Sequence, residues 1–107
     1  MASRHPGTFR NVPARSATGT LLYLVAVHEP PPIEPRGQLP PYQQIAEWLR
    51  GRIESGDLAP GAVLPSEKDL MGLFGVGRNT ARRTMAKLRE EGVIYTIPQR
   101  GSYVTRR

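Results

Sequence analysis

The stretch that most limits the fold is residues 65–83, which read PSEKDLMGLFGVGRNTARR. Ser66 can accept a hydrogen bond from the backbone three residues on, and Asp69 at that position can reciprocate, so a helix is expected to begin here. Two glycines, which flank Val76, end this helix and re-aim the chain. A second helix is then expected over 78–91. The two helices and their short turn make a helix-turn-helix pattern.

The helix expected over 78–91 has two different sides when its residues are placed about 100° apart. The inner stripe consists of Ala81, Thr84, Met85 and Leu88. The outer side consists of Asn79, Arg82, Arg83, Ala86 and Glu90, with Arg78 at its edge. Arginine can bond guanine O6 and N7 together, and asparagine can do the same for adenine N6 and N7. The pattern favours a helix that reads a DNA groove, and the alternative is a solvated amphipathic helix with incidental arginines.

The remaining elements complete a small, mostly helical domain. Apolar residues recur at helical spacing over 41–55, where we expect another helix. Residues 56–64 are expected to be a turn or a very short strand. Two β-rich runs, 93–97 and 102–105, should form a hairpin around a four-residue turn. The expected fold is three helices followed by a β-hairpin, a winged helix-turn-helix over residues 39–107.

Residues 1–38 are expected to form a separate, flexible and poorly ordered segment. This segment is rich in Pro, Gly and Arg and has no sustained periodicity. Residues 20–28 could make one short strand, but a lone strand has no partner in this region. The prolines between 30 and 41 suit an extended spacer, and a polyproline ligand for a partner domain is the alternative.

The positive charge of the chain is concentrated at one end. The formal net charge is +6, and residues 78–107 alone carry eight basic against two acidic residues. A polyanion such as double-stranded DNA would therefore meet this end first. Arg100, at the expected hairpin tip, and Lys68, in the first turn of the short helix, could contact phosphates, and the alternative for both is an ordinary surface cation.

Little in the sequence supports metal binding or catalysis. The chain has no cysteine, and His5 and His28 lie far apart without spaced partners, so neither a metal nor a cofactor is expected. No nucleophile and base stand together, so the protein is not expected to be an enzyme. The apolar run over 21–27 is too short to cross a bilayer, and a cytoplasmic location is expected.

Five motifs, in chain order, resemble the winged helix-turn-helix domain of the GntR (gluconate operon repressor) family of bacterial transcription regulators. They are YxxIAxxL from Tyr42, IESGDLxPGxxLPSE from Ile53, FGVxRNTxR from Phe74, LxxEG from Leu88 and RGxYV from Arg100. The resemblance covers residues 41–105, about two-thirds of the chain, and the ordered series is far more specific than any of its parts.

The resemblance implies a sequence-specific regulator of transcription, with repression favoured, whose third helix enters the major groove of double-stranded DNA beside the hairpin wing. It also implies a set of DNA contacts at Lys68, Arg78, Thr80 and Arg82, with Arg100 and Gly101 in the wing. The outer side of the helix expected over 78–91 adds Asn79 and Arg83 to this set. The expected site is therefore Lys68, Arg78, Asn79, Thr80, Arg82, Arg83, Arg100 and Gly101.

Three features depart from the family pattern. Gly77 stands where a capping Ser or Thr is usual, and Gln99 stands where the wing usually has Gly. The chain ends two residues past the wing, so the effector-binding domain of the family is expected to be absent from it.

Two further hypotheses concern partners. The domain could instead be a winged-helix protein-interaction module that binds DNA weakly and without sequence preference. A homodimer on DNA is expected if two half-sites are read, and residues 20–28 are the apolar segment that could pair.

Overall fold

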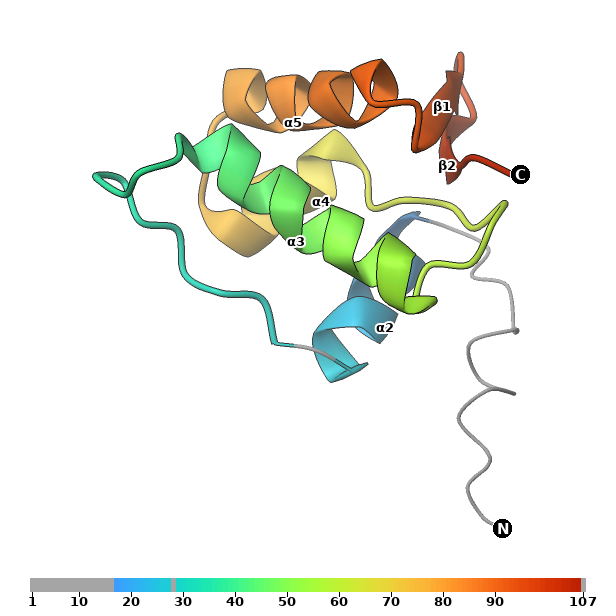
Figure 1. The fold of residues 1–107 in the computed structure, drawn as a ribbon, viewed down its shortest axis with the longest axis horizontal. Helices are drawn as coiled ribbons and strands as arrows, with labels where there is room; N and C mark the ends of the chain where they lie inside the picture. The colour runs from blue at the N-terminus through green and yellow to red at the C-terminus, as the bar shows by residue number, and fades with distance from the viewer. Residues whose placement is uncertain (1–16, 28, 107) are drawn as a thin grey trace, which may run out of the picture.

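The computed structural model describes residues 17–27 and 29–106. The described residues form four helices followed by one antiparallel hairpin (Figure 1). In chain order these elements are α2 (Ala17–Val27), α3 (Pro41–Ser55), α4 (Glu67–Phe74), α5 (Arg78–Glu90), β1 (Ile94–Ile97) and β2 (Gly101–Val104). Helices α3, α4 and α5 with the β1–β2 hairpin make the predicted mostly helical winged helix-turn-helix domain.

Helix α3 begins and ends as its sequence predicts. Pro41 occupies the first turn, where its missing N–H costs nothing, and Gly56 ends the helix with φ of 93°. The side chains of Ile45 and Leu49 are fully buried. They recur at helical spacing, so one face of α3 enters the core.

Helix α4 is short and is held at its start by a reciprocal cap. The backbone N–H of Asp69 donates to Ser66 Oγ at 3.0 Å, and the N–H of Ser66 donates back to Asp69 Oδ2 at 3.4 Å. Gly75 then takes the left-handed conformation, with φ of 67°. A side chain is strained there, so glycine suits this turn between the two helices.

Helix α5 packs against both α3 and α4. Its buried residues are Ala81, Thr84, Met85 and Leu88, as the sequence predicts. Thr84 Oγ1 donates 2.9 Å to the carbonyl of Thr80, and the same oxygen lies 3.3 Å from the carbonyl of Tyr42. The second contact ties the middle of α5 to the first turn of α3.

The hairpin is present, and the bounds of its strands, 94–97 and 101–104, differ by one residue from the predicted 93–97 and 102–105. Its register pairs Ile94 with Val104 and Ile97 with Gly101. Gly101 is therefore the first residue of β2, and the loop has three residues, 98–100, where four were predicted. The segment before α4 lies along the other side of β2, because the N–H of Gly61 donates 2.9 Å to the carbonyl of Val104. An isolated bridge joins Val63 to Tyr103, so the segment 56–64, expected to be a turn or a very short strand, consists of turns and this single bridge.

Helix α2 corrects the prediction of a strand over 20–28, because residues 20–27 form part of a helix and residue 28 lies outside the described residues. A helix satisfies its backbone hydrogen bonds within the segment, whereas a single strand here would leave them unpaired. Leu24 of α2 is fully buried and belongs to the same core as α3, α4 and α5. The segment 17–27 is therefore packed against the domain. The flexibility expected of residues 1–16 lies outside the described residues. None of the helices in the described part of the chain has the length and apolar content that a bilayer span requires.

Candidate nucleic-acid interface

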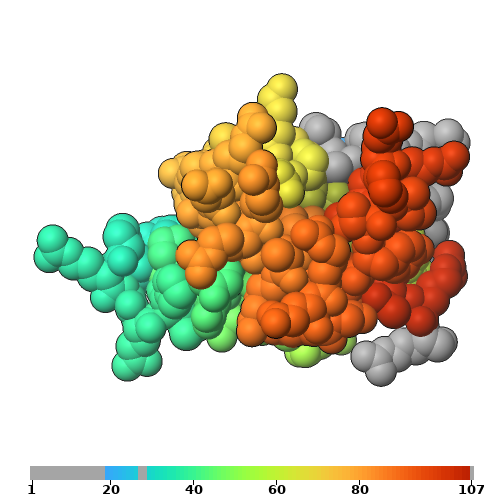
Figure 2. All heavy atoms as spheres, turned by 90° about the horizontal axis from the view of Figure 1, so that it is seen from above, coloured from blue at the N-terminus to red at the C-terminus, as the bar shows by residue number. Residues whose placement is uncertain are grey.

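One face of the molecule gathers most of the predicted DNA-binding residues. Figure 2 looks onto this face, where α5 (light orange) lies in the centre and the hairpin (red) stands beside its end. Helix α2 lies on the side of the molecule opposite to α5, with α3 and α4 between them (Figure 1). The interface is thus a helix and a wing supported from behind by the core.

The first turns of α5 present four of the predicted residues to solvent. Arg78, Asn79, Arg82 and Arg83 are all exposed. Thr80 is half-buried, and its carbonyl accepts the hydrogen bond from Thr84. Because the buried stripe anchors the opposite side of the helix, this exposed side is the one that can enter a groove.

The cations of this exposed side differ in what they contact. Within the described residues, neither Arg78 nor Arg82 forms an ion pair with an acidic side chain, whereas Arg89 near the end of α5 donates 3.1 Å to Thr96 Oγ1 of the hairpin. The positive charge at the start of α5 is therefore available to an anion.

The acidic end of α5 is neutralised from α3. Arg50 binds Glu91 through two hydrogen bonds, from Nε to Oε1 at 2.9 Å and from Nη2 to Oε2 at 2.8 Å. The hydrogen bonding of Arg50 to Glu91 also raises the pKa of Arg50. Lys87 Nζ lies 3.8 Å from the same carboxylate. This network weakens the repulsion that Glu91 would exert on a DNA backbone.

The wing places Arg100 at its exposed tip. The N–H of Arg100 donates 3.0 Å to the carbonyl of Ile97, which closes a turn with Pro98 and Gln99 at its centre. Gln99 has φ of 65°, the left-handed conformation that glycine adopts at least cost. Gln99 therefore accepts the backbone geometry that the glycine of the family pattern would provide. Gly101 follows with φ of 136°.

Lys68 lies in the first turn of α4 and is exposed. It is on the helix that precedes the turn into α5, so the structure places it on a different element from the four exposed residues of α5. Elsewhere in the described ranges, no three His, Asp or Glu side chains gather as a metal site would require.

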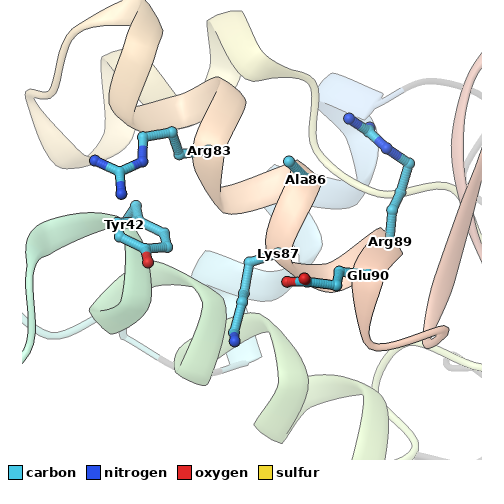
Figure 3. Close-up of a pocket in the computed structure, with 6 residues that line it drawn as sticks. All are labelled: Tyr42, Arg83, Ala86, Lys87, Arg89 and Glu90. Atoms are coloured by element: carbon cyan, nitrogen blue, oxygen red, sulfur yellow. The ribbon is translucent and has the colours of Figure 1, made fainter.

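From the sequence, Tyr42 was given only as the start of a motif in the helix expected over 41–55, and its contact with α5 was missed. A shallow groove of about 590 Å³ lies beside α5 (Figure 3) and is lined by Tyr42, Arg83, Ala86, Lys87, Arg89 and Glu90. Arg83 Cζ lies 4.2 Å from the centroid of the Tyr42 ring, a cation–π contact between α5 and α3. The hydrogen bond from Gln43 lowers the pKa of Tyr42, and the charge of Arg83 lowers it further, against the opposing effect of burial. The signal available in the sequence was an aromatic residue at the very start of a helix, where burial is incomplete.

Comparisons with known proteins agree with this geometry. The family described as bacterial regulatory proteins, gntR family, matches residues 41–104. The HTH-type transcriptional repressor NagR of Bacillus subtilis is 36% identical over 74 residues, which cover 69% of this chain and 30% of that protein. The mannosyl-D-glycerate transport/metabolism system repressor MngR of Escherichia coli is 41% identical over 68 residues, which cover 64% of this chain and 28% of that protein. The chain thus spans about a third or less of the length of these curated relatives.

A solved structure with a similar fold contains DNA. The DNA-binding domain of AraR in complex with operator ORX1 has a TM-score of 0.64 and 30% sequence identity to this chain. The match covers 73% of this chain and 100% of the AraR domain.

Proposed function

The chain belongs to the GntR family of bacterial regulatory proteins, and from that membership we propose that it represses transcription by binding an operator in double-stranded DNA. Residues 39–107 would be the DNA-binding domain, with Leu24 of α2 completing its core from outside that range. The protein would act in the bacterial cytoplasm, where the chromosome lies, and without catalytic activity of its own. The observation that carries this proposal is the exposed start of α5, whose arginines lack ion-pair partners among the described residues.

The start of α5 would enter the major groove. In this arrangement Arg78, Asn79 and Arg82 approach base edges, because the N-terminal residues of a recognition helix lie deepest in the groove. Arg82 is one turn further along the helix than Arg78, so the two can reach different base pairs. The exposed and small Ala86 lets the helix backbone come close to the DNA.

The other predicted residues would hold the duplex by its backbone. Lys68 can bind a phosphate from the start of α4, and Arg100 can reach the flanking groove or backbone from the wing tip. Thr80 is half-buried, so its hydroxyl would contact only a phosphate that comes close to α5. Gly101 would act through the shape of the wing, since it carries no side chain.

The decisive experiment compares a selected duplex with a random one. An operator is first selected from a randomised duplex pool with the wild-type protein, and affinities are then measured by gel shift at several salt concentrations. Arg82→Ala should weaken binding to the selected duplex about 10- to 100-fold and reduce the preference over random DNA. Arg36→Ala, at an exposed arginine of the linker before α3, is the matched control and should retain the preference.

The alternative function has its own signature in this experiment. A winged-helix protein-interaction module would select no consensus and would bind both duplexes weakly, with similar salt dependence. Unchanged affinity of Arg82→Ala for the selected duplex would reject the role given to α5.

We further propose that two copies bind two half-sites as a homodimer on DNA. Pairing through Leu22, an exposed large apolar residue of α2, suits this arrangement poorly. Helix α2 faces away from α5, so such a pair would direct its two α5 helices in opposite directions (Figure 1). Cooperative binding to half-sites about one helical turn apart is the expected result, and independent occupation of the two half-sites would contradict it.

A further inference from the structure

We propose that the Tyr42 end of the groove beside α5 binds one backbone phosphate of the duplex, and that Tyr42 is the positioning residue that holds Arg83 for this contact. The inference rests on the proposed function, because it names the part of the DNA that this groove would take. It gives Arg83, one of the predicted residues on the outer side of α5, the specific role of a clamp on the sugar-phosphate backbone.

The position of the Tyr42 ring is set by two helices. Tyr42 belongs to the first turn of α3, and its carbonyl lies 3.3 Å from Thr84 Oγ1 on the buried side of α5. This contact fixes the start of α3 against α5. The ring then lies beside the exposed side of α5, under the guanidinium of Arg83 (Figure 3).

The contact with Tyr42 leaves Arg83 able to bind an anion. A guanidinium over the face of an aromatic ring is attracted by the π-electrons and loses side-chain freedom. Among the ion pairs of the described residues, none involves Arg83, so no carboxylate competes for its N–H donors. A planar guanidinium held in place can donate two parallel hydrogen bonds to a phosphate.

The Tyr42 hydroxyl is a second donor at the same place. Gln43 Nε2 donates 3.0 Å to Tyr42 Oη, so the hydroxyl oxygen already accepts one hydrogen bond. Its own proton can be donated to a phosphate oxygen. The lowered pKa of Tyr42 supports this role, because a more acidic phenol is a stronger hydrogen-bond donor.

The opposite end of the groove is less suited to a phosphate. Glu90 lies there with Arg89 (Figure 3). Arg89 donates a hydrogen bond to Thr96 of the hairpin. Lys87, between the two ends, is near the carboxylate of Glu91. The charges of the described residues therefore favour an anion at the end where Tyr42 and Arg83 meet.

A phosphate contact and a base contact predict different behaviour of neighbouring arginines. Every base pair carries the same phosphates, so a clamp at Arg83 would add affinity for any duplex. Arg82 directly precedes Arg83 on the same helix and is also exposed, and it is proposed to read bases. The pair therefore forms an internal control within one turn of α5.

The test measures the affinity of each variant for the selected and the random duplex over a range of salt. Arg83→Gln should weaken binding to both duplexes by the same factor, about 10-fold, and should reduce the slope of log K against log salt by about 0.9. Tyr42→Leu, which removes ring and hydroxyl, should weaken both equally, and Tyr42→Phe should recover part of the loss because it retains the ring. In the Tyr42→Leu/Arg83→Gln double variant the two losses should be less than additive.

Three outcomes would overturn the proposal. They are a change in the preference for the selected duplex in Arg83→Gln, an unchanged affinity in Tyr42→Leu, and full additivity in the double variant. A circular dichroism melt of each variant confirms that it is folded, and Arg83→Gln, at an exposed position, keeps the test valid if Tyr42→Leu unfolds. If the wild-type protein prefers no sequence, the proposed function fails. The affinities of the Arg83 and Tyr42 variants for random DNA, relative to wild type, still decide whether the phosphate site exists.

Discussion

Two single residues hold backbone positions at which a different side chain would be more favourable. Gln99 has φ of 65° in the wing turn, and Gly77 caps α5 without a side-chain hydrogen bond. Both positions also depart from the pattern of the family. Their effects on stability can be predicted from local geometry alone.

Gln99→Gly should raise the free energy of unfolding by about 0.5–1 kcal/mol, because left-handed backbone costs an L-residue more than it costs glycine. Urea denaturation followed by circular dichroism measures the change. Arg100→Gly is the matched control, since Arg100 is the neighbouring loop residue and has no positive φ. It should leave stability unchanged or lower it, and a stability gain in both variants would contradict this account.

Gly77→Ser should also be stabilising, by about 0.5–1 kcal/mol, through a new helix cap and a less flexible unfolded chain. Gly77 has φ of −80° and ψ of 174°, which any residue can adopt. A Cβ built on Gly77 meets no heavy atom within 4 Å. Thermal unfolding measures the change, and Gly75→Ser, at φ of 67°, should destabilise the protein in the same measurement. Destabilisation by both changes would argue against an open cap at Gly77.

The elements owe their bounds to caps and their orientation to buried stripes. Helix α4, Glu67–Phe74, has only eight residues, and isolated helices of this length are marginal in water. It therefore depends on the reciprocal cap of Ser66 and Asp69 and on burial of Leu70. Since α4 positions the turn into α5, its stability bears on the whole helix-turn-helix.

Ser66→Ala should lower the free energy of unfolding by about 1 kcal/mol, because it removes the acceptor for the N–H of Asp69. The urea midpoint should fall while the slope of the transition stays the same. Lys68→Ala, in the same turn and exposed, is the control and should stay within about 0.5 kcal/mol of wild type. Equal losses in the two variants would mean that the cap is not the cause.

At the scale of the whole molecule, α2 packs against a domain whose match to the family begins only at residue 41. Helix α2 carries no charged residue. Leu24 is 0% exposed and Leu22 is 66% exposed, although both belong to this one helix. Comparing substitutions at the two leucines therefore tests whether α2 packs on the core or is merely attached to it.

Leu24→Ala should lower the free energy of unfolding by about 2–5 kcal/mol, since it removes buried methyl groups and leaves a cavity. Leu22→Ala should change stability by no more than about 0.5 kcal/mol. Thermal and urea unfolding of the full chain measure both. Similar values for the two variants would show that α2 does not share the core.

Much of the proposed site could be predicted because most of its residues belong to one helix. The spacing of Ala81, Met85 and Leu88 determines which side of α5 is buried, so the exposed position of Arg82 follows from helical periodicity. The length of the hairpin loop could not be predicted in this way. Gly101 suits a turn by composition, and only its pairing with Ile97 makes it the first residue of β2.

The sequence by itself determined where α3, α4 and α5 start and stop, their buried stripes and the cationic end of the chain, because these depend on neighbours within a few positions. Tertiary structure decided what the chain does with its distant parts. It made residues 17–27 a helix by giving Leu24 a core to enter, and it brought Tyr42 under Arg83, 41 positions further along the chain. Contacts between residues so far apart depend on how whole helices pack, and local pattern carries no record of that packing.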